Sequence, residues 1–423
     1  MEAAPGPTLS EGLDLAGRSA RPWIAAAVGW SIALILSFWI PPFADEAYYA
    51  DWSRSWSLGH FDHPPGVAWW MALSPGSPRV LGLIAVPLSL ALLADAGRRL
   101  EIPQWRWVPA LILWTPLGMA WPLIVTPDMP LLVCWSAVIW ATVARKPFWC
   151  TLALAGCLWS KPAVVLALPG LWWCWRGRGL FIIAGAFALY SPHLWWSAQN
   201  DWLPFSFQGG RAWTGVHIGE LIGGQLALIS PVWCGVLLAR RRGWRARVDL
   251  WALSLPIFAG WALISLVMRV EANWPALAWP AAALIFADEP LTQRWRSWMA
   301  LAMSWGGLAV GVLIWITHAL PVGLGPPRDG ESLSLCLEAA LGPVPMVATR
   351  YQERALLGNA VQVVMPEGGR SNEYIRSGQS ALDAQCGFVL LGDVEGLAGQ
   401  CAGRPVSGRA CHRPITWCRC KRP

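Results

Sequence analysis

The stretch PWIAAAVGWSIALILSFWI, residues 22–40, decides the class of fold, because it is a long apolar run without a charged residue. A helix needs about 20 apolar residues to cross the hydrocarbon core of a bilayer. The run follows a polar start that contains Arg18 and Arg21, and no small-residue cleavage pattern comes after it. These features predict an uncleaved signal-anchor helix and not a cleaved signal peptide.

The whole chain has the composition of a membrane protein. Of its 423 residues, 55% are hydrophobic and 13% are charged, whereas a soluble domain carries about 25% charged residues. The composition therefore predicts an α-helical polytopic membrane protein with about eleven transmembrane helices. The further apolar runs lie near 79–95, 105–124, 129–144, 148–160, 162–175, 180–197, 217–238, 250–267, 274–287 and 297–317.

The basic residues are distributed among the predicted loops in a way that gives an orientation. If the N-terminal arginines are cytoplasmic, 16 Lys or Arg residues of the segment 1–317 fall on the cytoplasmic side and five on the outer side. This bias agrees with the positive-inside rule. We therefore interpret the net charge of +7 as a topology signal, and it indicates no nucleic-acid partner. The outer basic residues are Arg54, Arg79, Lys161, Arg211 and Arg269.

The predicted first outer loop, residues 41–78, is rich in polar side chains. PPFADEAYY at 41–49 is followed by GHFDHPPG at 59–66, and with Asp51 between them the segment 41–66 holds four acids and two histidines. Ionisable groups at membrane depth are costly to bury and are therefore functional candidates. The pattern predicts a site for a phosphate-bearing lipid and a polar acceptor at the outer mouth of the bundle. A solvated loop with ordinary polar residues is the alternative.

The C-terminal part, residues 318–423, differs in composition from residues 1–317. It is less hydrophobic, and stretches such as 344–349 and 387–391 predict short strands. An odd number of transmembrane helices makes this part extracytoplasmic, and we expect a small α/β domain. Disulfides are expected in an oxidising compartment, although their pairing stays open, and the tail matches no standard zinc site. The cysteines of this part are Cys336, Cys386, Cys401, Cys411, Cys418 and Cys420.

Several short motifs, taken together in their order, resemble the protein-mannosyltransferase-like family 39 of the GT-C glycosyltransferases, which is related to the aminoarabinose transferases. Each motif is weak alone, whereas their joint order over residues 22–376 is specific. The resemblance implies a GT-C transmembrane catalytic domain over residues 1–317. The motifs are DEAYY at 45–49, GHFDHPP at 59–65, TPDMPLL at 126–132, Ser160-Lys161, NDW at 200–202, FSFQ at 205–208, EANWP at 271–275, RYQ at 350–352 and GGRSNEY at 368–374.

The resemblance implies an inverting transferase that moves a sugar from a polyprenyl-phosphate donor, of the undecaprenyl-phosphate type, to an acceptor hydroxyl on a lipid, polysaccharide or protein. The reaction takes place at the outer face of the inner membrane. Asp45 is the expected general base, because a positioned carboxylate can take the proton of the attacking hydroxyl. Glu46 is expected to support Asp45 by pairing with a cation or by holding the acceptor. Alternatively, both acids simply cap a helix.

The departing phosphate requires positive charge nearby. We expect Lys161 and Arg211 to supply it, the arginine in a bidentate way and the lysine as a point charge. His63 precedes a Pro-Pro pair at a place where the related aminoarabinose transferases often carry lysine, so its charge depends on pH. Asp62 is expected to keep His63 protonated or to bind an ion, and a structural loop contact is the alternative.

Other residues are expected around the sugar cavity. Asp128 either lines this cavity or caps its helix, and Asn273 is expected at the rim. Tyr48 and Tyr49 either place the sugar or acceptor or only lie at the membrane surface. Arg269 either binds phosphate or pairs with the glutamate two residues later.

The sequence leaves other points open. No cofactor is certain, and a divalent metal ion stays open because some GT-C enzymes use one and others do not. A transporter or lipid flippase is the alternative of another class, although no internal repeat is visible and the charges gather at one face. A polysaccharide polymerase or ligase is chemically closer. The identities of the sugar and of the acceptor and the oligomeric state do not follow from the sequence.

Overall fold

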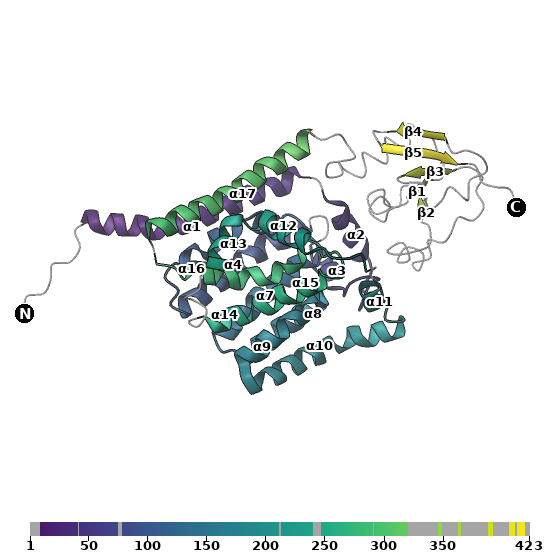
Figure 1. The fold of residues 1–423 in the computed structure, drawn as a ribbon. Coiled ribbons are helices and arrows are strands. Elements are labelled where there is room, and N and C mark those ends of the chain that lie inside the picture. The colour runs from purple at the N-terminus through teal and green to yellow at the C-terminus, as the bar shows by residue number, and fades with distance from the viewer. Residues whose placement is uncertain are drawn as a thin grey trace, which may run out of the picture.

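The computed structural model describes residues 9–40, 42–74, 78–210, 213–239, 247–290 and 292–319, together with five short strands after residue 345. Up to residue 319 the described chain is a bundle of helices joined by short loops (Figure 1). The predicted anchor segment lies in α1 (Leu9–Trp39), and the last helix of the bundle is α17 (Gln293–Ala319).

Each predicted apolar run becomes helical, and several runs become more than one helix. The helices between α1 and α17 are α2 (Ala44–Trp52), α3 (Gly66–Ala72), α4 (Arg79–Arg99), α5 (Val108–Leu113), α6 (Pro116–Ala120), α7 (Asp128–Val143), α8 (Pro147–Ser160), α9 (Leu168–Trp175), α10 (Gly179–Gln199), α11 (Leu203–Gly209), α12 (Ile218–Leu228), α13 (Pro231–Ala239), α14 (Val248–Ala252), α15 (Leu255–Ile264) and α16 (Trp279–Ala287). Short 3₁₀ helices are η1 (Trp105–Trp107), η2 (Pro162–Ala167), η3 (Arg176–Arg178) and η4 (Trp274–Ala278).

Proline is the main reason for these divisions, since it lacks an amide donor and disfavours helical backbone at the preceding residue. The run 217–238 becomes α12 and α13, which meet at 107° just before Pro231. Among the described residues, three helices are long and apolar enough to cross a membrane, or four if the bent pair is one span. Four shorter apolar helices accompany them. The count of about eleven spans stays a prediction.

Helix α7 packs against both α4 and α8, and α8 also packs against α10. Trp135, Val138 and Ile139 of α7 are fully buried. A helix that is apolar on all sides is buried inside a bundle or against lipid. The buried position of α7 fixes the place of its first residue, Asp128.

The helices bring alternate loops to two ends of the bundle. At one end Arg247 donates to the carbonyl of Leu100 at 2.9 Å and to Asp288 at 2.7 Å. At the other end Gln208 of α11 donates to the carbonyl of Asp62 at 3.0 Å. Figure 1 shows α2 and α11 at this second end, away from α14 and α16. The loops predicted as outer therefore meet one another, and so do those predicted as cytoplasmic.

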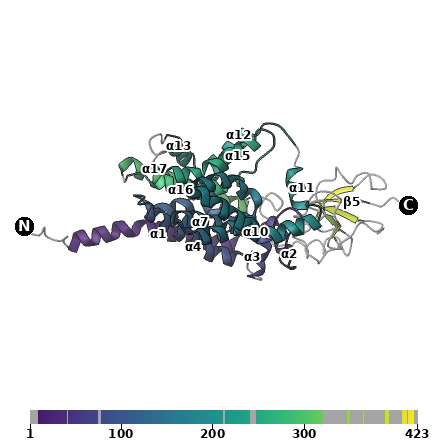
Figure 2. The same ribbon diagram turned by 90° about the horizontal axis from the view of Figure 1, so that it is seen from below.

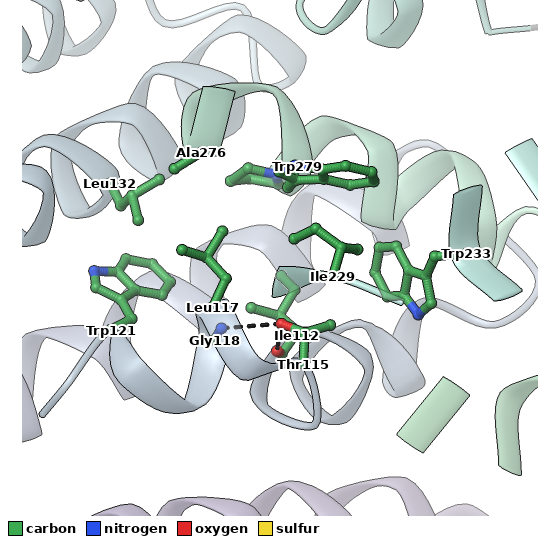
Figure 3. Close-up of a pocket in the computed structure, with 11 residues that line it drawn as sticks. Ile112, Thr115, Leu117, Gly118, Trp121, Leu132, Ile229, Trp233, Ala276 and Trp279 are labelled. Carbon is green, nitrogen blue, oxygen red and sulfur yellow. Dashed lines mark hydrogen bonds between the residues drawn. The ribbon is translucent and has the colours of Figure 1, made fainter. Parts of the chain in front are cut away.

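A small cavity between α5, α6, α13 and α16 is a gap in packing. Its volume is about 20 Å³, close to the minimum that holds one water molecule. Figure 3 shows Trp121, Trp233 and Trp279 around it. The hydroxyl of Thr115 is already used, because it donates to the carbonyl of Ile112 at 2.8 Å and accepts from Gly118 N at 2.9 Å (Figure 3). This cavity therefore offers little to a polar ligand.

The strands after residue 345 form one mixed sheet in the order β2-β1-β3-β5-β4. Strand β1 is parallel to β2 and β3, whereas β5 is antiparallel to β3 and β4. The sheet lies beyond the end of the bundle that carries α2 and α11 (Figures 1 and 2). The strands are β1 (Met346–Ala348), β2 (Val363–Val364), β3 (Phe388–Leu391), β4 (Val406–Ala410) and β5 (Arg413–Cys418).

Two of these strands fall in the stretches predicted as strands, 344–349 and 387–391. Helices of the expected α/β domain, the motifs at 350–352 and 368–374, and the side chains of the six cysteines lie outside what the structure describes. The α/β domain, its disulfides and the division at residues 317/318 therefore stay predictions.

Candidate active site

A cavity of about 850 Å³ lies among α2, α11, α15, η2 and the loops that precede α3, α7 and η4. This volume is in the range of small-molecule binding sites, about 300–1,000 Å³. Its wall contains polar groups from six separate parts of the chain and apolar side chains such as Leu166, Phe205 and Trp261. The predicted site residues that line it are Asp45, Tyr49, Asp62, His63, Asp128, Lys161 and Asn273.

The start of α2 gives Asp45 and Glu46 different surroundings. Both acids lie in the first helical turn, which favours negative charge. Glu46 accepts a hydrogen bond from Phe43 N at 2.8 Å, as the acidic residue of a capping box does. Asp45, one residue earlier, lines the cavity. The capping alternative therefore describes Glu46, whereas the side chain of Asp45 borders the cavity.

Glu46 is enclosed by donors. It is 1% exposed and does not belong to the cavity wall. Arg79 donates to Oε1 at 3.0 Å and to Oε2 at 2.6 Å, and Val125 N donates to Oε1 at 3.1 Å. Glu46 thus pairs with a cation in addition to its capping contact, and its support of Asp45 stays a prediction. The partner, Arg79, stood out in the sequence only as an exception to the charge rule.

Aromatic side chains join α2 to the loop before α3. Tyr48 is fully buried outside the cavity wall, and its hydroxyl donates to Asp62 Oδ1 at 3.4 Å. Trp52 stacks on His60 with ring centroids 4.3 Å apart and an angle of 6° between the planes. The ring centroid of Tyr49 lies 6.4 Å from that of His63. Tyr49, not Tyr48, is therefore the tyrosine that faces the cavity.

Asp128, Lys161 and Asn273 meet in the cavity wall, although they are far apart in the chain. Lys161 Nζ lies 2.8 Å from Asp128 Oδ1, and Asn273 Nδ2 donates to Asp128 Oδ2 at 2.5 Å. Lys161 Nζ also lies 6.0 Å from the ring centroid of Trp274. Local sequence helps to place Lys161. The next residue, Pro162, disfavours helical backbone at Lys161, which is extended at φ −158° and ψ 119°, so α8 ends just before the lysine.

Of the two other predicted cations, Arg269 belongs to the described residues and Arg211 does not. Arg269 is not in the cavity wall; its side chain is 65% exposed and lies 3.4 Å from Glu220 and 3.9 Å from Glu271. Pairing, one of its two alternatives, is thus what the structure shows, and Glu271 itself lines the cavity. Arg211 lies outside the described residues, as does Ala212.

The described residues contain no group of three or more His, Cys, Asp or Glu side chains with the geometry of a metal site. The metal requirement therefore stays as open as the sequence left it. The side chains of Asp45, Asp62 and Glu271 line the same cavity without forming such a group.

Sequence reasoning gave no role to two residues, one behind the cavity wall and one in it. Arg79 pairs with Glu46, and its signal was its place at the start of an apolar run on the outer side. Gln208 lines the cavity and donates to the carbonyl of Asp62 at 3.0 Å. It stands in the FSFQ motif, but only the tertiary structure shows its contact with a loop 146 residues earlier.

Two solved structures are similar to nearly the whole chain. ArnT from Cupriavidus metallidurans bound to undecaprenyl phosphate has a TM-score of 0.64 and 15% identity, covering 93% of this chain and 98% of that one. ArnT from the same organism in the apo state has a TM-score of 0.65 and 15% identity, covering 94% and 98%. No family model and no curated protein sequence matches the chain. The chain therefore has the fold of these ArnT structures, which is consistent with its apolar helices and with an integral membrane protein.

Proposed function

We propose that this protein is an inverting glycosyltransferase of the family 39 type that takes a sugar from a polyprenyl-phosphate donor. The observation that carries the proposal is the joint placement of Asp45 and the Asp128–Lys161–Asn273 group around one cavity of about 850 Å³. A carboxylate and a cation are the two charges that this transfer needs. The similarity to a structure bound to undecaprenyl phosphate supports a donor of that class.

In the proposed reaction an acceptor hydroxyl attacks C1 of the sugar, and the bond from C1 to the phosphate oxygen breaks. Asp45 takes the hydroxyl proton as the new bond forms. The bonding electron pair leaves with the phosphate, which needs no general acid because it is already a weak base. An ammonium group has three donors, so Lys161 can contact a phosphate oxygen while it keeps its contact with Asp128.

The remaining residues have supporting roles in this proposal. Tyr49, His63 and Asn273 line the cavity where the sugar and its phosphate would lie. Arg211 remains a proposed second phosphate ligand. We propose that the cavity faces the exterior of the inner membrane, since the positive-inside rule puts the arginine-rich loops in the cytoplasm. The acceptor stays a lipid, a polysaccharide or a protein.

The test is the Asp45→Asn variant of the purified protein. It is supplied with labelled undecaprenyl-phosphate sugars and an extract of envelope lipids and glycans as acceptors. We expect turnover to fall by about 10²–10⁴-fold, the usual contribution of a general base, while undecaprenyl phosphate still binds.

Asp51→Asn is the matched control, because Asp51 lies on the same helix outside the cavity wall and 3.4 Å from Arg54. This variant should keep its turnover. Unimpaired transfer by Asp45→Asn would remove the proposed mechanism. Movement of undecaprenyl phosphate across vesicles without sugar transfer would favour a flippase instead.

A further inference from the structure

A buried ion pair, Glu46 with Arg79, lies behind the wall of the large cavity. Their side chains are 1% and 9% exposed. Neither residue lines the cavity. Burial of both charges is costly unless hydrogen bonds satisfy them. The groups that form these hydrogen bonds therefore show which segments the pair connects.

The carboxylate of Glu46 uses its full acceptor capacity, which is about four sites. Two hydrogen bonds come from Arg79, one from Phe43 N and one from Val125 N. Phe43 immediately precedes α2, and Val125 lies in the loop before α7. One carboxylate thus joins two segments that are 79 residues apart in the chain.

Arg79 connects this carboxylate to a third segment. Its Nη1 donates to the carbonyl of Ser37 at 3.0 Å and to the carbonyl of Ile40 at 2.6 Å. These carbonyls belong to the end of α1 and the residue after it, where a helix has unsatisfied acceptors. The pair therefore ties α2 and the loop before α7 to the ends of two membrane helices, α1 and α4.

The two tied segments carry the two carboxylates to which the proposed function gives a role, Asp45 and Asp128. Asp45 is the neighbour of Glu46, and Asp128 follows Val125 by three residues. We infer that Glu46 and Arg79 are positioning residues that fix the separation between the proposed base, Asp45, and the phosphate-binding pair Asp128–Lys161. This inference rests on the proposed transferase function.

The chain offers a matched control for an ordinary structural pair. Arg247 donates to Asp288 at 3.0 and 2.7 Å and to a carbonyl, that of Leu100, at 2.9 Å. This pair has the same bidentate form and also joins three segments, but none of its members lines the cavity. Weakening it should affect stability without moving the proposed site.

The experiment compares Glu46→Gln and Glu46→Asp with Asp288→Asn in the purified full-length protein. Glu46→Asp keeps the charge, which preserves the ion pair, but the shorter side chain cannot reach all four donors. We measure kcat and KM per folded molecule with the labelled undecaprenyl-phosphate sugar that the unaltered protein turns over. A misplacement of about 1 Å costs about 10²-fold in rate, so we expect kcat to fall to that extent in both Glu46 variants while undecaprenyl phosphate binding changes less than about threefold.

Hydrogen–deuterium exchange gives a readout that does not depend on activity. In the Glu46 variants we expect faster exchange in segments 42–52 and 121–127 together, because Glu46 holds one amide in each. Asp288→Asn should leave both segments and kcat unchanged. Normal kcat in folded Glu46→Asp, or faster exchange in only one segment, would overturn the inference. The proposed function fails by a different result, unimpaired transfer by Asp45→Asn.

Discussion

Lys161 and Asp128 form an ion pair in the wall of the large cavity, with Nζ 2.8 Å from Oδ1. Their side chains are 11% and 13% exposed, so the pair is largely shielded from water but still borders the cavity. Because Asn273 occupies the other oxygen of Asp128, the carboxylate is committed to holding its neighbours. Lys161 is the residue of this pair whose ammonium group can still donate a hydrogen bond to a ligand.

Replacing Lys161 by methionine should weaken the binding of undecaprenyl phosphate. A hydrogen bond to a charged group contributes about 1.5–3 kcal/mol, so we expect the Kd to rise by about 10- to 150-fold. Binding is measured by titration of the purified protein in detergent. Lys161→Arg should bind much better than Lys161→Met because it keeps the charge, and Lys146→Met, at an exposed position before α8, should bind normally. Equal binding by Lys161→Met and the unaltered protein would contradict a phosphate role.

Replacing Asp128 by asparagine should lower turnover more than binding. The amide keeps one acceptor but loses the charge that holds Lys161, so the ammonium group is less well placed at the moment when the phosphate departs. We expect kcat to fall by about 10- to 100-fold with a smaller change in KM. Steady-state kinetics with the labelled donor separate the two quantities. A change confined to KM would indicate that Asp128 acts only in donor binding.

Replacing Arg269 by methionine should leave undecaprenyl phosphate binding within about twofold, since an exposed ion pair contributes little energy. Its guanidinium lies 3.4 Å from Glu220 and 3.9 Å from Glu271, and Arg269 does not line the cavity. The same titration that is used for Lys161 measures this. A loss as large as that of Lys161→Met would place Arg269 among the phosphate ligands after all.

Replacing Gly118 by alanine should destabilise the protein without a specific effect on the proposed site. A Cβ atom at this position would clash with the backbone carbonyl of Ile112, which cannot move as a side chain can. Overpacking of this kind costs about 1–3 kcal/mol, and thermal unfolding in detergent should occur at a lower temperature. Gly223→Ala is the control, because nothing lies within 4 Å of its Cβ position in α12. If both variants unfold at the same temperature as the unaltered protein, the expected clash between a Cβ atom at Gly118 and the carbonyl of Ile112 does not occur.

Much of the membrane architecture could be predicted from local sequence. The apolar runs gave the helices, since a backbone in lipid must satisfy its own hydrogen bonds and a helix does so within one segment. The helix breaks were harder to place, as the bend of 107° between α12 and α13 shows. That bend depends on how the two parts pack against other helices as well as on Pro231.

For the site, the sequence by itself determined which residue types stand at the helix boundaries predicted as outer: the acids at 45 and 46, Asp128 and Lys161. The distances along the chain say nothing about which of them meet. Only the tertiary structure decided that Asp45 borders the cavity while Glu46 turns to Arg79, and that Lys161 pairs with Asp128 across 33 residues. The physical reason is that hydropathy and helix boundaries are local properties of the chain, whereas the partner of a buried charge is chosen by the packing of segments distant in sequence.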